Sequence, residues 1–426
     1  MKVIQINTVV GSGSVGRITV GLYDTAVANQ LQARVCYGRR QAPAAMGAHA
    51  YKNCHVFDCV SHVLRNFVIG DSGFGSVRAT GRLLHFLEEE QADVIHLHNI
   101  HGFYLHVGML FAYLKKKQVP VVWTLHDCWA MTGHCAYFDY VHCDKWKKGC
   151  FSCPQHRTSY PYALLRDNSL HNYAEKKAAF TGMPHLTIVT PSHWLAELVR
   201  QSYLKEYPEK VIYNGIDTEV FAPSAPILES AGACVDNSSA RTHSYTVLGV
   251  ANIWEKRKGL SYFEALAVSL PDDYHIIVVG VDPRQSRLLQ KKEKQGILPK
   301  GKITAITRTD NMTALAELYR QADVYVNPTL EDNFPTTNLE ALACGTPVVT
   351  FATGGSPEAL DENTGIVVEQ GNTEALTQAV CRIAEASSQG LPRYSTEACR
   401  NRALLFRQQD QFQKYIELYR TIAGQL

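Results

Sequence analysis

Short apolar runs alternate with segments of helical periodicity along most of the first half of the chain. The apolar runs predict strands at residues 3–7, 33–37, 94–98, 119–125 and 186–190. Segments with apolar residues every three or four positions predict helices at residues 17–30, 82–90, 109–117 and 194–202, while residues 40–65 look less regular. Strands and helices that alternate in this way form a parallel sheet with helices on both faces.

A second alternating series occupies the other half. Its predicted strands are residues 246–250, 275–280, 302–306, 324–326, 347–351 and 365–368, and its predicted helices are residues 260–269, 313–321 and 373–385. The sequence therefore predicts an α/β protein with two doubly wound domains.

Three segments suggest where the domains meet. Residues 211–217 form a short strand and turn that we interpret as the seam, and the polar residues 222–244 predict a surface loop. The long helical stretch 403–423 is expected to pack back across the seam. We place the domains at residues 1–208 and 209–400, and the C-terminal helix at residues 401–426.

Composition agrees with a globular protein, because 46% of the 426 residues are hydrophobic and 19% are charged. A formal net charge of +2 gives no indication of nucleic-acid binding. The first residues are too polar for a signal peptide, and no apolar run approaches the roughly 20 residues of a membrane span. We therefore expect a soluble, cytoplasmic protein. The basic residues within 65–82 and 115–117 leave peripheral contact with the inner membrane face open, with a solvated face as the alternative.

Two carboxylates mark the loop that follows the predicted strand at residues 324–326. Asp332 lies in the loop, and Glu340 lies in the first turn of the next predicted helix. Open α/β sheets bind ligands at such loops, and a helix start suits a phosphate. Glu340 would accept hydroxyl protons from a vicinal diol such as a ribose. The alternative is structural, because Thr337-x-x-Glu340 fits a capping box and Asp332-Asn333 fits an Asx turn.

Three further features are weak evidence when each is taken alone. The glycine-rich residues 11–16 follow the first strand but lack the acidic partner of a dinucleotide fingerprint. His126 follows the strand at residues 119–125 and is expected on the ligand side, although a lone histidine there is more often structural. Residues 256–258, Lys-Arg-Lys, have a solvated charge run as their alternative interpretation.

Five of the twelve cysteines crowd into residues 128–153. A Cys-x2-Cys turn is the usual half of a structural zinc site, and thiolates suit tetrahedral zinc. We predict a structural zinc in a Cys-rich insertion at residues 128–156, with reduced thiols in a loop as the alternative. The predicted ligands are Cys135, Cys143, Cys150 and Cys153, with His134, His142 and Cys128 as substitutes.

Taken in order, these features resemble a retaining glycosyltransferase of family 4. The most specific part is residues 330–349, which are similar to the family's acidic-x7-Glu motif with its helix and next strand. Residues 123–135 with the following cysteines are similar to the colanic-acid and exopolysaccharide branch. The resemblance covers nearly the whole chain and includes Gly13, Lys258 and residues 214–217. It implies the GT-B fold, with two Rossmann-like domains that face each other across a cleft.

The resemblance also implies residue roles. Glu340 matches the ribose-binding carboxylate, and Asp332 matches the acidic residue that contacts the transferred sugar, where most members carry Glu. Lys258 matches the lysine that binds the diphosphate, and Arg257 is the surrogate for an arginine whose usual position holds Asn252. The other implied donor-binding residues are Gly13, Asn333, Phe334, Thr336 and Thr337. The implied catalytic residues are His126, Asp332, Lys258 and Arg257, while His98 and His101 would line the acceptor side.

We therefore predict a retaining hexosyltransferase that moves a sugar from a nucleotide-sugar to a glycan or lipid-linked oligosaccharide in bacterial surface polysaccharide biosynthesis. No cofactor is expected for catalysis, because no Asp-x-Asp motif is placed to hold a metal. Two alternatives remain: a nucleotide-sugar 2-epimerase of the same fold, and a non-catalytic protein that binds a nucleotide-sugar or a glycan.

Overall fold

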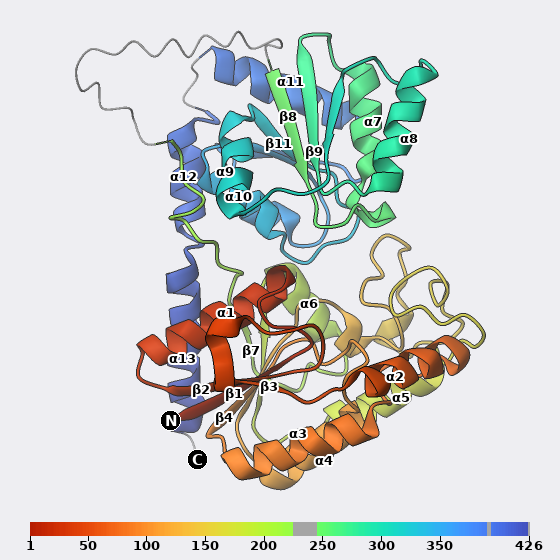
Figure 1. Ribbon diagram of the computed structural model, residues 1–426, viewed down its shortest axis with the longest axis vertical. Coiled ribbons are helices and arrows are strands. Elements are labelled where there is room, and N and C mark those ends of the chain that lie inside the picture. The colour runs from red at the N-terminus through yellow and green to blue at the C-terminus, as the bar shows by residue number, and fades with distance from the viewer. Residues whose placement is uncertain (225–244, 390–392, 425–426) are drawn as a thin grey trace. The chain divides into compact units, whose positions relative to one another are not determined.

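The chain forms two compact units in a computed structural model that describes residues 1–224, 245–389 and 393–424 (Figure 1). Unit 1 comprises Met1–Gly215 with Gln408–Leu426, and unit 2 comprises Ile216–Arg407. The chain thus divides after Gly215 and Arg407, whereas the sequence placed its boundaries after residues 208 and 400. Most of the surface loop predicted at residues 222–244 lies outside the described residues.

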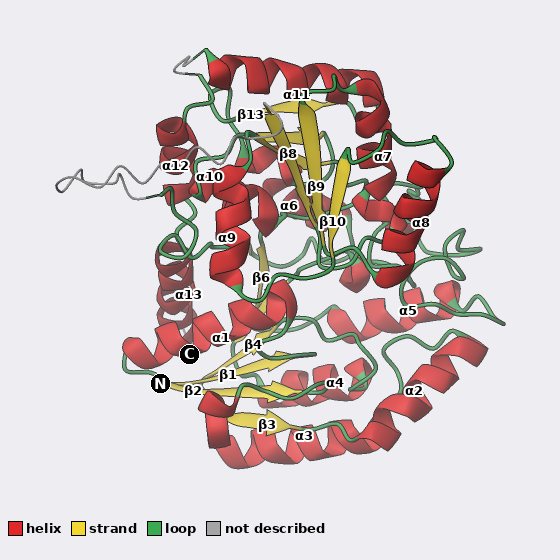
Figure 2. Cartoon of the chain, turned by 45° about the horizontal axis from the view of Figure 1, so that its top comes forward, coloured by secondary structure: helices red, strands yellow, loops and turns green. Residues whose placement is uncertain are grey.

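Unit 1 is built on a seven-stranded parallel sheet with the order β3-β2-β1-β4-β5-β6-β7. Figure 2 shows β3, β2, β1 and β4 next to one another in this order. The strands are β1 (Lys2–Asn7), β2 (Gln32–Tyr37), β3 (Ala50–Lys52), β4 (Val94–Leu97), β5 (Val121–Thr124), β6 (Leu186–Thr190) and β7 (Glu209–Val211). The α-helices are α1 (Gly13–Ala28), α2 (Val56–Ile69), α3 (Val77–Glu90), α4 (Val107–Lys117), α5 (Ser169–Phe180), α6 (His193–Gln201) and α13 (Gln408–Ala423). The 3-10 helices are η1 (Ala44–His49), η2 (Trp129–Met131) and η3 (Lys145–Lys147).

Helices cover both faces of this sheet, so its central strands are buried along their length. Every residue of β4, β5 and β6 is buried, as expected for a parallel sheet between helical layers. On the face that α1 covers, Phe412 of α13 lies against Gly21, where a Cβ would fall 2.3 Å from the phenyl ring. Glycine at this position therefore lets α13 complete that face of unit 1.

Unit 2 is built on a six-stranded parallel sheet with the order β10-β9-β8-β11-β12-β13. The strands are β8 (Tyr245–Val250), β9 (Tyr274–Val279), β10 (Ile303–Ile306), β11 (Val324–Asn327), β12 (Val348–Phe351) and β13 (Gly365–Val368). The helices are η4 (Lys256–Lys258), α7 (Leu260–Ser269), α8 (Pro283–Lys294), α9 (Met312–Gln321), α10 (Thr336–Ala343), η5 (Ser356–Ala359), α11 (Thr373–Ser388) and α12 (Thr396–Leu404). Its core is a separate cluster around Phe263, Ile276 and Phe351.

Each sheet has a point at which the strand order reverses. β1 lies between β2 and β4, and β8 lies between β9 and β11. Doubly wound folds bind ligands outside the carboxyl ends of the strands at this point. Gly13 follows β1, Lys258 follows β8, and Asp332 follows β11. The prediction of two doubly wound α/β domains is confirmed.

The structure differs from the sequence prediction at residues 40–65, which looked less regular. These residues contain η1, β3 and most of α2. α2 lacked a recognisable inward apolar face because its buried residues, His62 and Asn66, are polar. No helix in the described part of the chain is long and apolar enough to span a membrane.

Candidate active site

Buried amides hold the loop after β11 in shape. Asn327 Nδ2 donates to Asn338 Oδ1 at 2.8 Å, and Asn338 Nδ2 donates to Ser356 O at 3.3 Å. These bonds tie the end of β11 to the first turn of α10 and to η5. The first N–H groups of α10, including those of half-buried Thr336 and Thr337, have no acceptor within their helix. The loop therefore presents a helix start at the carboxyl edge of the sheet.

The loop after β8 pairs with the loop after β11. The amide of Leu330 donates to Arg257 O at 2.6 Å. Gly259 has a φ of +79°, and a Cβ there would fall 2.2 Å from the carbonyl oxygen of Pro328. A residue with a side chain is excluded by both the φ angle and this contact. Glycine thus permits the close approach of the two loops.

This approach brings together two predicted site residues, Lys258 and Asp332. Lys258 Nζ forms an ion pair with Asp332 Oδ2, and the two side chains are 23% and 14% exposed. Asp332 Oδ1 also accepts from the amide of Asn333 at 2.9 Å. Arg257 Nη1 donates to Glu331 O at 3.0 Å, which binds its guanidinium to the same loop. Two cations therefore lie beside the start of α10, where a bound diphosphate would find both charge and N–H donors.

Glu340 lies in α10 and is only 4% exposed. Tyr319 Oη, on α9, donates to Glu340 Oε2 at 2.9 Å. Pro335 occupies the N-cap of α10, which has no side-chain cap. The capping-box interpretation of Thr337-x-x-Glu340 is therefore wrong, since Glu340 lies beyond the third helical position and its carboxylate is held by Tyr319. No pattern in the sequence indicated Tyr319, which comes from a different helix.

Two predicted donor-binding residues anchor the loop through their side chains or backbone. The Phe334 ring is buried and lies 5.6 Å from the Phe406 ring, measured between centroids. The carbonyl of Asn333, which is also buried, accepts from the amide of Gly355 at 2.8 Å. These contacts fix the path of the loop ahead of α10.

Gly13 begins α1 in unit 1. It has a φ of +69°, and a Cβ would meet no atom within 4 Å. The neighbouring turn is closed by a bond from the amide of Gly11 to Gly16 O at 2.9 Å. Gly13 therefore presents open backbone at the start of a helix, next to the point where the sheet order reverses.

His126, after β5, ends a chain of hydrogen bonds through unit 1. Gln5 Nε2 donates to Thr19 O at 3.2 Å, so Gln5 Oε1 accepts from His98 Nε2 at 3.0 Å. A neutral His98 then has an unprotonated Nδ1, which accepts from His126 Nε2 at 3.1 Å. A neutral His126 therefore carries its proton on Nε2 and keeps Nδ1 as an acceptor.

Burial keeps this chain of imidazoles neutral. It lowers the pKa of His126 to about 4, against the opposing charge of Asp127. Burial also lowers the pKa of His98 and of His96 well below 6.5, and the neighbouring histidines add to the shift. His126 is therefore suited to accept a hydroxyl proton in a hydrogen bond rather than to supply a charge.

His101 lies in a second polar group of unit 1. Its Nε2 is 2.9 Å from Asp127 Oδ2, and its Nδ1 is 3.1 Å from Tyr160 Oη. The amide of Trp129 donates to Asp127 Oδ1 at 2.9 Å. Burial raises the pKa of Asp127, but His101 and these hydrogen bonds outweigh it, so the net shift is downward. The sequence did not indicate that His101 and Asp127 form a pair.

The cysteine segment brings together some of its predicted ligands. The hydrogen bond that Cys135 donates to Cys153, and to a smaller extent burial, raise the pKa of Cys135, and Cys150 Sγ accepts from the amide of Gly133 at 3.1 Å. No group of three or more His, Cys, Asp or Glu residues suited to a metal occurs among the described residues. The structural zinc at Cys135, Cys143, Cys150 and Cys153 stays a prediction, which metal analysis of protein purified without added metal would test.

The predicted site residues thus fall into two groups. Unit 2 gathers most of them on the paired loops and α10: Arg257, Lys258, Asp332, Asn333, Phe334, Thr336, Thr337 and Glu340. Unit 1 holds Gly13 and His126 on the loops after β1 and β5, at the carboxyl edge of its sheet.

Comparison with known families assigns both units to the same class. The family described as "Glycosyltransferase Family 4" matches residues 16–220, and "Glycosyl transferases group 1" matches residues 244–386. The fold and these matches define a glycosyltransferase with the GT-B fold. The chain belongs to glycosyltransferase family 4.

Individual relatives point in the same direction. The putative colanic acid biosynthesis glycosyl transferase WcaC of Escherichia coli K12 is 23% identical over 393 residues, which cover 89% of this chain and 90% of that protein. A glycosyltransferase structure from Rickettsia africae superposes with a TM-score of 0.69 at 16% identity, covering 99% of this chain and 98% of that one. Anabaena Alr3699/HepE in complex with UDP-glucose gives a TM-score of 0.64 at 16% identity, covering 99% and 100%. These structural likenesses establish the fold.

Proposed function

We propose that this glycosyltransferase moves a hexosyl residue from a nucleoside-diphosphate sugar to a hydroxyl of a glycan or lipid-linked oligosaccharide, with retention at the anomeric carbon. The observation that carries the proposal is the paired loops of unit 2. They place Lys258, Arg257 and the start of α10 beside two carboxylates, Asp332 and Glu340. This combination suits a ligand that has both a diphosphate and hydroxyl groups.

Each group has a separate task in the proposed reaction. Lys258 and Arg257 stabilise the negative charge that grows on the departing diphosphate. As the donor binds, its phosphate competes with Asp332 for Lys258, and Asp332 is released toward the hydroxyls of the transferred sugar. Glu340, oriented by Tyr319, accepts from the ribose hydroxyls. His126 accepts from a sugar hydroxyl through its unprotonated Nδ1.

Retention requires no protein nucleophile in this proposal. The acceptor oxygen attacks the anomeric carbon on the face from which the diphosphate leaves, and the departing phosphate oxygen takes the acceptor proton. The C–O bond to the diphosphate breaks as the C–O bond to the acceptor forms. The protein contributes positioning and charge stabilisation, which fits a site of cations, amides and hydroxyl-binding groups.

Related proteins support the proposed donor and acceptor classes. Alr3699/HepE is solved with UDP and with UDP-glucose, and WcaC is named for colanic acid biosynthesis. The lipopolysaccharide core mannosyltransferase LpsB of Rhizobium meliloti is 27% identical over 203 residues, which cover 45% of this chain and 56% of that protein. These names support our proposal that the reaction belongs to the synthesis of a bacterial surface polysaccharide.

Donor turnover by carboxamide variants tests the site. A thermal-shift screen of nucleotide-sugars first identifies the donor, because a ligand of the folded state raises its stability. Asp332→Asn and Glu340→Gln should then each lower turnover of that donor by at least about tenfold, the equivalent of ~1.4 kcal/mol. The exposed carboxylates Asp272 and Glu374 supply matched controls through Asp272→Asn and Glu374→Gln. Full turnover in both site variants would show that the assignment is wrong.

The same assay separates the two alternative functions. A 2-epimerase converts the donor to an isomeric sugar without an acceptor, whereas a transferase needs an acceptor or hydrolyses the donor slowly. A protein that binds the donor but consumes none with any acceptor pool would be a binding protein.

A further inference from the structure

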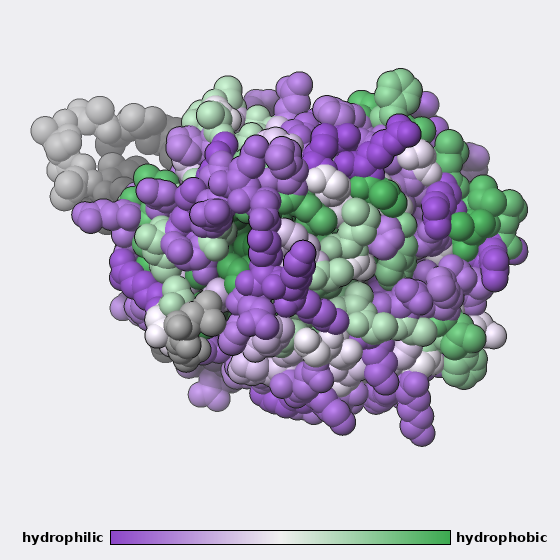
Figure 3. Space-filling view, turned by 90° about the horizontal axis from the view of Figure 1, so that it is seen from below, coloured by the Kyte–Doolittle hydropathy of each residue, from purple (hydrophilic) through white to green (hydrophobic). Residues whose placement is uncertain are grey.

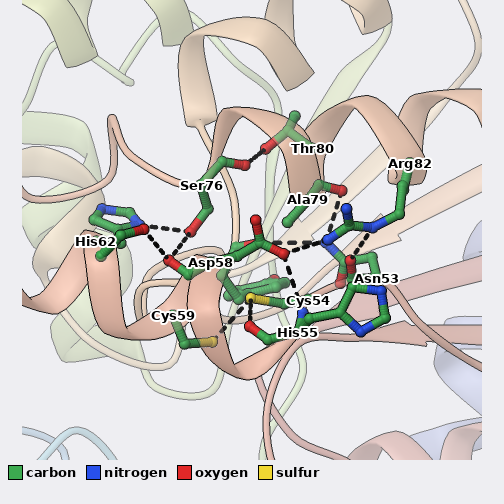
Figure 4. A network of polar contacts seen from close by, with 12 residues as sticks. Asn53, Cys54, His55, Asp58, Cys59, His62, Ser76, Ala79, Thr80 and Arg82 are labelled. Carbon is green, nitrogen blue, oxygen red and sulfur yellow. Dashed lines mark hydrogen bonds and ion pairs between the residues drawn. The ribbon is translucent and has the colours of Figure 1, made fainter.

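α2 is unusual in that the two residues it buries fully, His62 and Asn66, are polar, whereas several of its large apolar side chains are exposed. His62 is 1% exposed, its Nδ1 lies 3.0 Å from Ser76 Oγ, and its Nε2 accepts from the amide of Gly75 at 3.1 Å. One turn earlier, Asp58 forms an ion pair with Arg82 (Figure 4). These contacts, which span successive turns on one side of α2, fix its rotation about its own axis.

The apolar side of α2 is consequently exposed. Val60 and Leu64 are two positions away from buried His62 and Asn66, which corresponds to about 200° around a helix. Phe57, one turn before Val60, is 88% exposed. The complete outward stripe is Val56, Phe57, Val60, Leu64 and Val68.

The loop before α5 extends this apolar surface. Asn66 Nδ2 donates to Tyr162 O at 2.7 Å, and the amide of Leu164 donates to Phe67 O at 2.9 Å. The loop therefore lies along the end of α2, and its Leu165 is 71% exposed. We call residues 55–82 and 140–170 together the α2 face. More than half of the exposed large hydrophobic side chains among the described residues lie in these two segments.

The two segments that form the α2 face also concentrate positive charge. Their cations are Arg65, Arg78, Arg82, Lys145, Lys147, Lys148, Arg157 and Arg166, whereas their carboxylates are Asp58, Asp71, Asp144 and Asp167. This excess of four is larger than the net charge of +2 for the whole chain. Lys148, Arg157 and Arg166 form no ion pair with any residue that the structure describes. Figure 3 shows hydrophobic side chains interspersed with hydrophilic ones at the right-hand edge, the edge at which α2 runs in Figure 1.

We propose that the α2 face docks unit 1 onto the surface of an anionic lipid bilayer. The stripe of α2 and the leucines of the adjacent loop enter the boundary between headgroups and acyl chains, as apolar faces of interfacial helices do. The flanking Lys and Arg side chains remain at headgroup level, where each gains from the negative surface potential. This proposal stands on unit 1 alone and does not depend on the transferase reaction.

Charge favours a bilayer over a second copy of the chain as the partner. A symmetric dimer through the α2 face would place each cationic rim against the same surface of its partner. Burial of the two apolar centres would then bring the two basic rims together, and the repulsion between like charges would weaken the dimer. An anionic surface meets both the apolar and the basic residues without this conflict.

Sedimentation of the full chain with lipid vesicles tests the apolar stripe. The wild type should sediment with vesicles that contain phosphatidylglycerol and much less with vesicles of phosphatidylcholine. The triple variant Phe57→Ser/Leu64→Ser/Leu165→Ser should lower the ratio of vesicle-bound to free protein by at least about tenfold. The control Val268→Ser/Leu288→Ser/Ile297→Ser removes comparably exposed side chains of unit 2 and should bind as the wild type does.

A second pair of variants tests the charges. Lys148→Glu/Arg157→Glu/Arg166→Glu should abolish the preference for phosphatidylglycerol, whereas Lys291→Glu/Lys294→Glu/Lys300→Glu should preserve it. Circular dichroism and melting temperature confirm that each variant is folded. The proposal is overturned if the wild type does not prefer anionic vesicles, or if each control loses as much binding as its matched variant. A dimer of the wild type in light scattering that the serine variant dissociates would also overturn it, in favour of a second copy.

Discussion

The two units share one architecture but use different chemistry at the carboxyl edges of their sheets. Unit 1 has imidazoles there: His98 is fully buried, His126 is half-buried, and desolvation holds both neutral. Unit 2 has a partly exposed ion pair, Lys258–Asp332, beside a helix start. A parallel sheet therefore determines where the ligand-binding site lies. The residues that follow each strand determine whether this site binds through charged groups or through neutral hydrogen-bonding groups.

Removal of the Lys258 cation from unit 2 should have the largest effect on donor turnover. Lys258→Ala leaves the growing charge of the diphosphate with one cation fewer, and we expect donor turnover to fall by about 10²- to 10³-fold. Steady-state kinetics with the identified donor measures this loss. Lys256→Ala, which removes an exposed lysine two positions away, is the control and should retain most of the activity. Equal losses of activity in both variants would mean that Lys258 does not stabilise the charge of the departing diphosphate.

Acid should destabilise unit 1 before unit 2. Burial lowers the pKa of His62 to about 4 in the folded protein, whereas an exposed histidine titrates near 6.5. Between these values the unfolded state binds more protons, so stability is complete above about pH 6.5 and is lost as pH falls toward 4. His62 alone contributes about 3 kcal/mol to this loss, and the lowered pKa values of His96, His98, His126 and His134 add to it.

Fluorescence can assign this acid transition to a unit. Trp254 is the tryptophan of unit 2, and the other four tryptophans belong to unit 1. Thermal melts of Trp254→Phe from pH 8 to pH 4 should show the unit 1 transition moving to lower temperature below about pH 6.5. If acid does not divide the wild-type signal into an early transition shared with the variant and a later Trp254 transition that the variant lacks, the proposed difference in acid sensitivity is wrong.

A smaller effect should follow from loss of the acceptor that orients His126. In His98→Ala, His126 Nε2–H loses its partner, whereas His98→Asn can supply an amide oxygen near the former Nδ1. We expect turnover to fall by about tenfold in the alanine variant and to recover partly in the asparagine variant. Nitrogen-15 spectra of His126 should report the Nε2–H tautomer in the wild type and a mixture in His98→Ala. An unchanged spectrum would contradict the positioning role.

The smallest effect is expected at Tyr319. Tyr319→Phe keeps the ring but removes the hydrogen bond to Glu340, a loss of about 1 kcal/mol. The KM for the donor should rise about fivefold with little change in kcat, because the ribose contact is present before and during transfer. Tyr274→Phe removes another buried hydroxyl in the core of unit 2 and is the control. An unchanged KM for the donor in Tyr319→Phe would indicate that Glu340 does not bind the ribose.

The same contrast explains what the sequence could predict. Alternating apolar runs identified most of the strands that form both sheets, because parallel strands buried on two faces are apolar throughout. α2 was missed because a helix with His62 and Asn66 inward breaks the rule that apolar residues face the core. The chain of Gln5, His98 and His126 depends on the pairing of β1 with β4 and β4 with β5, which residue spacing alone does not reveal.

Parts of the candidate site followed from the family resemblance and could not have followed from local pattern. Lys258 and Asp332 are 74 residues apart, and their contact requires the glycine at position 259 to let two loops meet. The motif spacing selected Glu340, but the hydroxyl that orients it comes from α9. Contacts between distant segments depend on tertiary packing, and the sequence of either segment alone does not predict them.

The return of the chain to unit 1 has a consequence for its biogenesis. α13 contributes Phe412, Tyr415, Ile416 and Tyr419 to the core that α1 also lines, and Tyr419 Oη lies 2.6 Å from His96 Nδ1 beneath the sheet. These residues are translated only after all of unit 2 has been made. Unit 1 is therefore the first domain to leave the ribosome and the last to complete its fold. One face of its core stays uncovered until unit 2 and α13 have been synthesised.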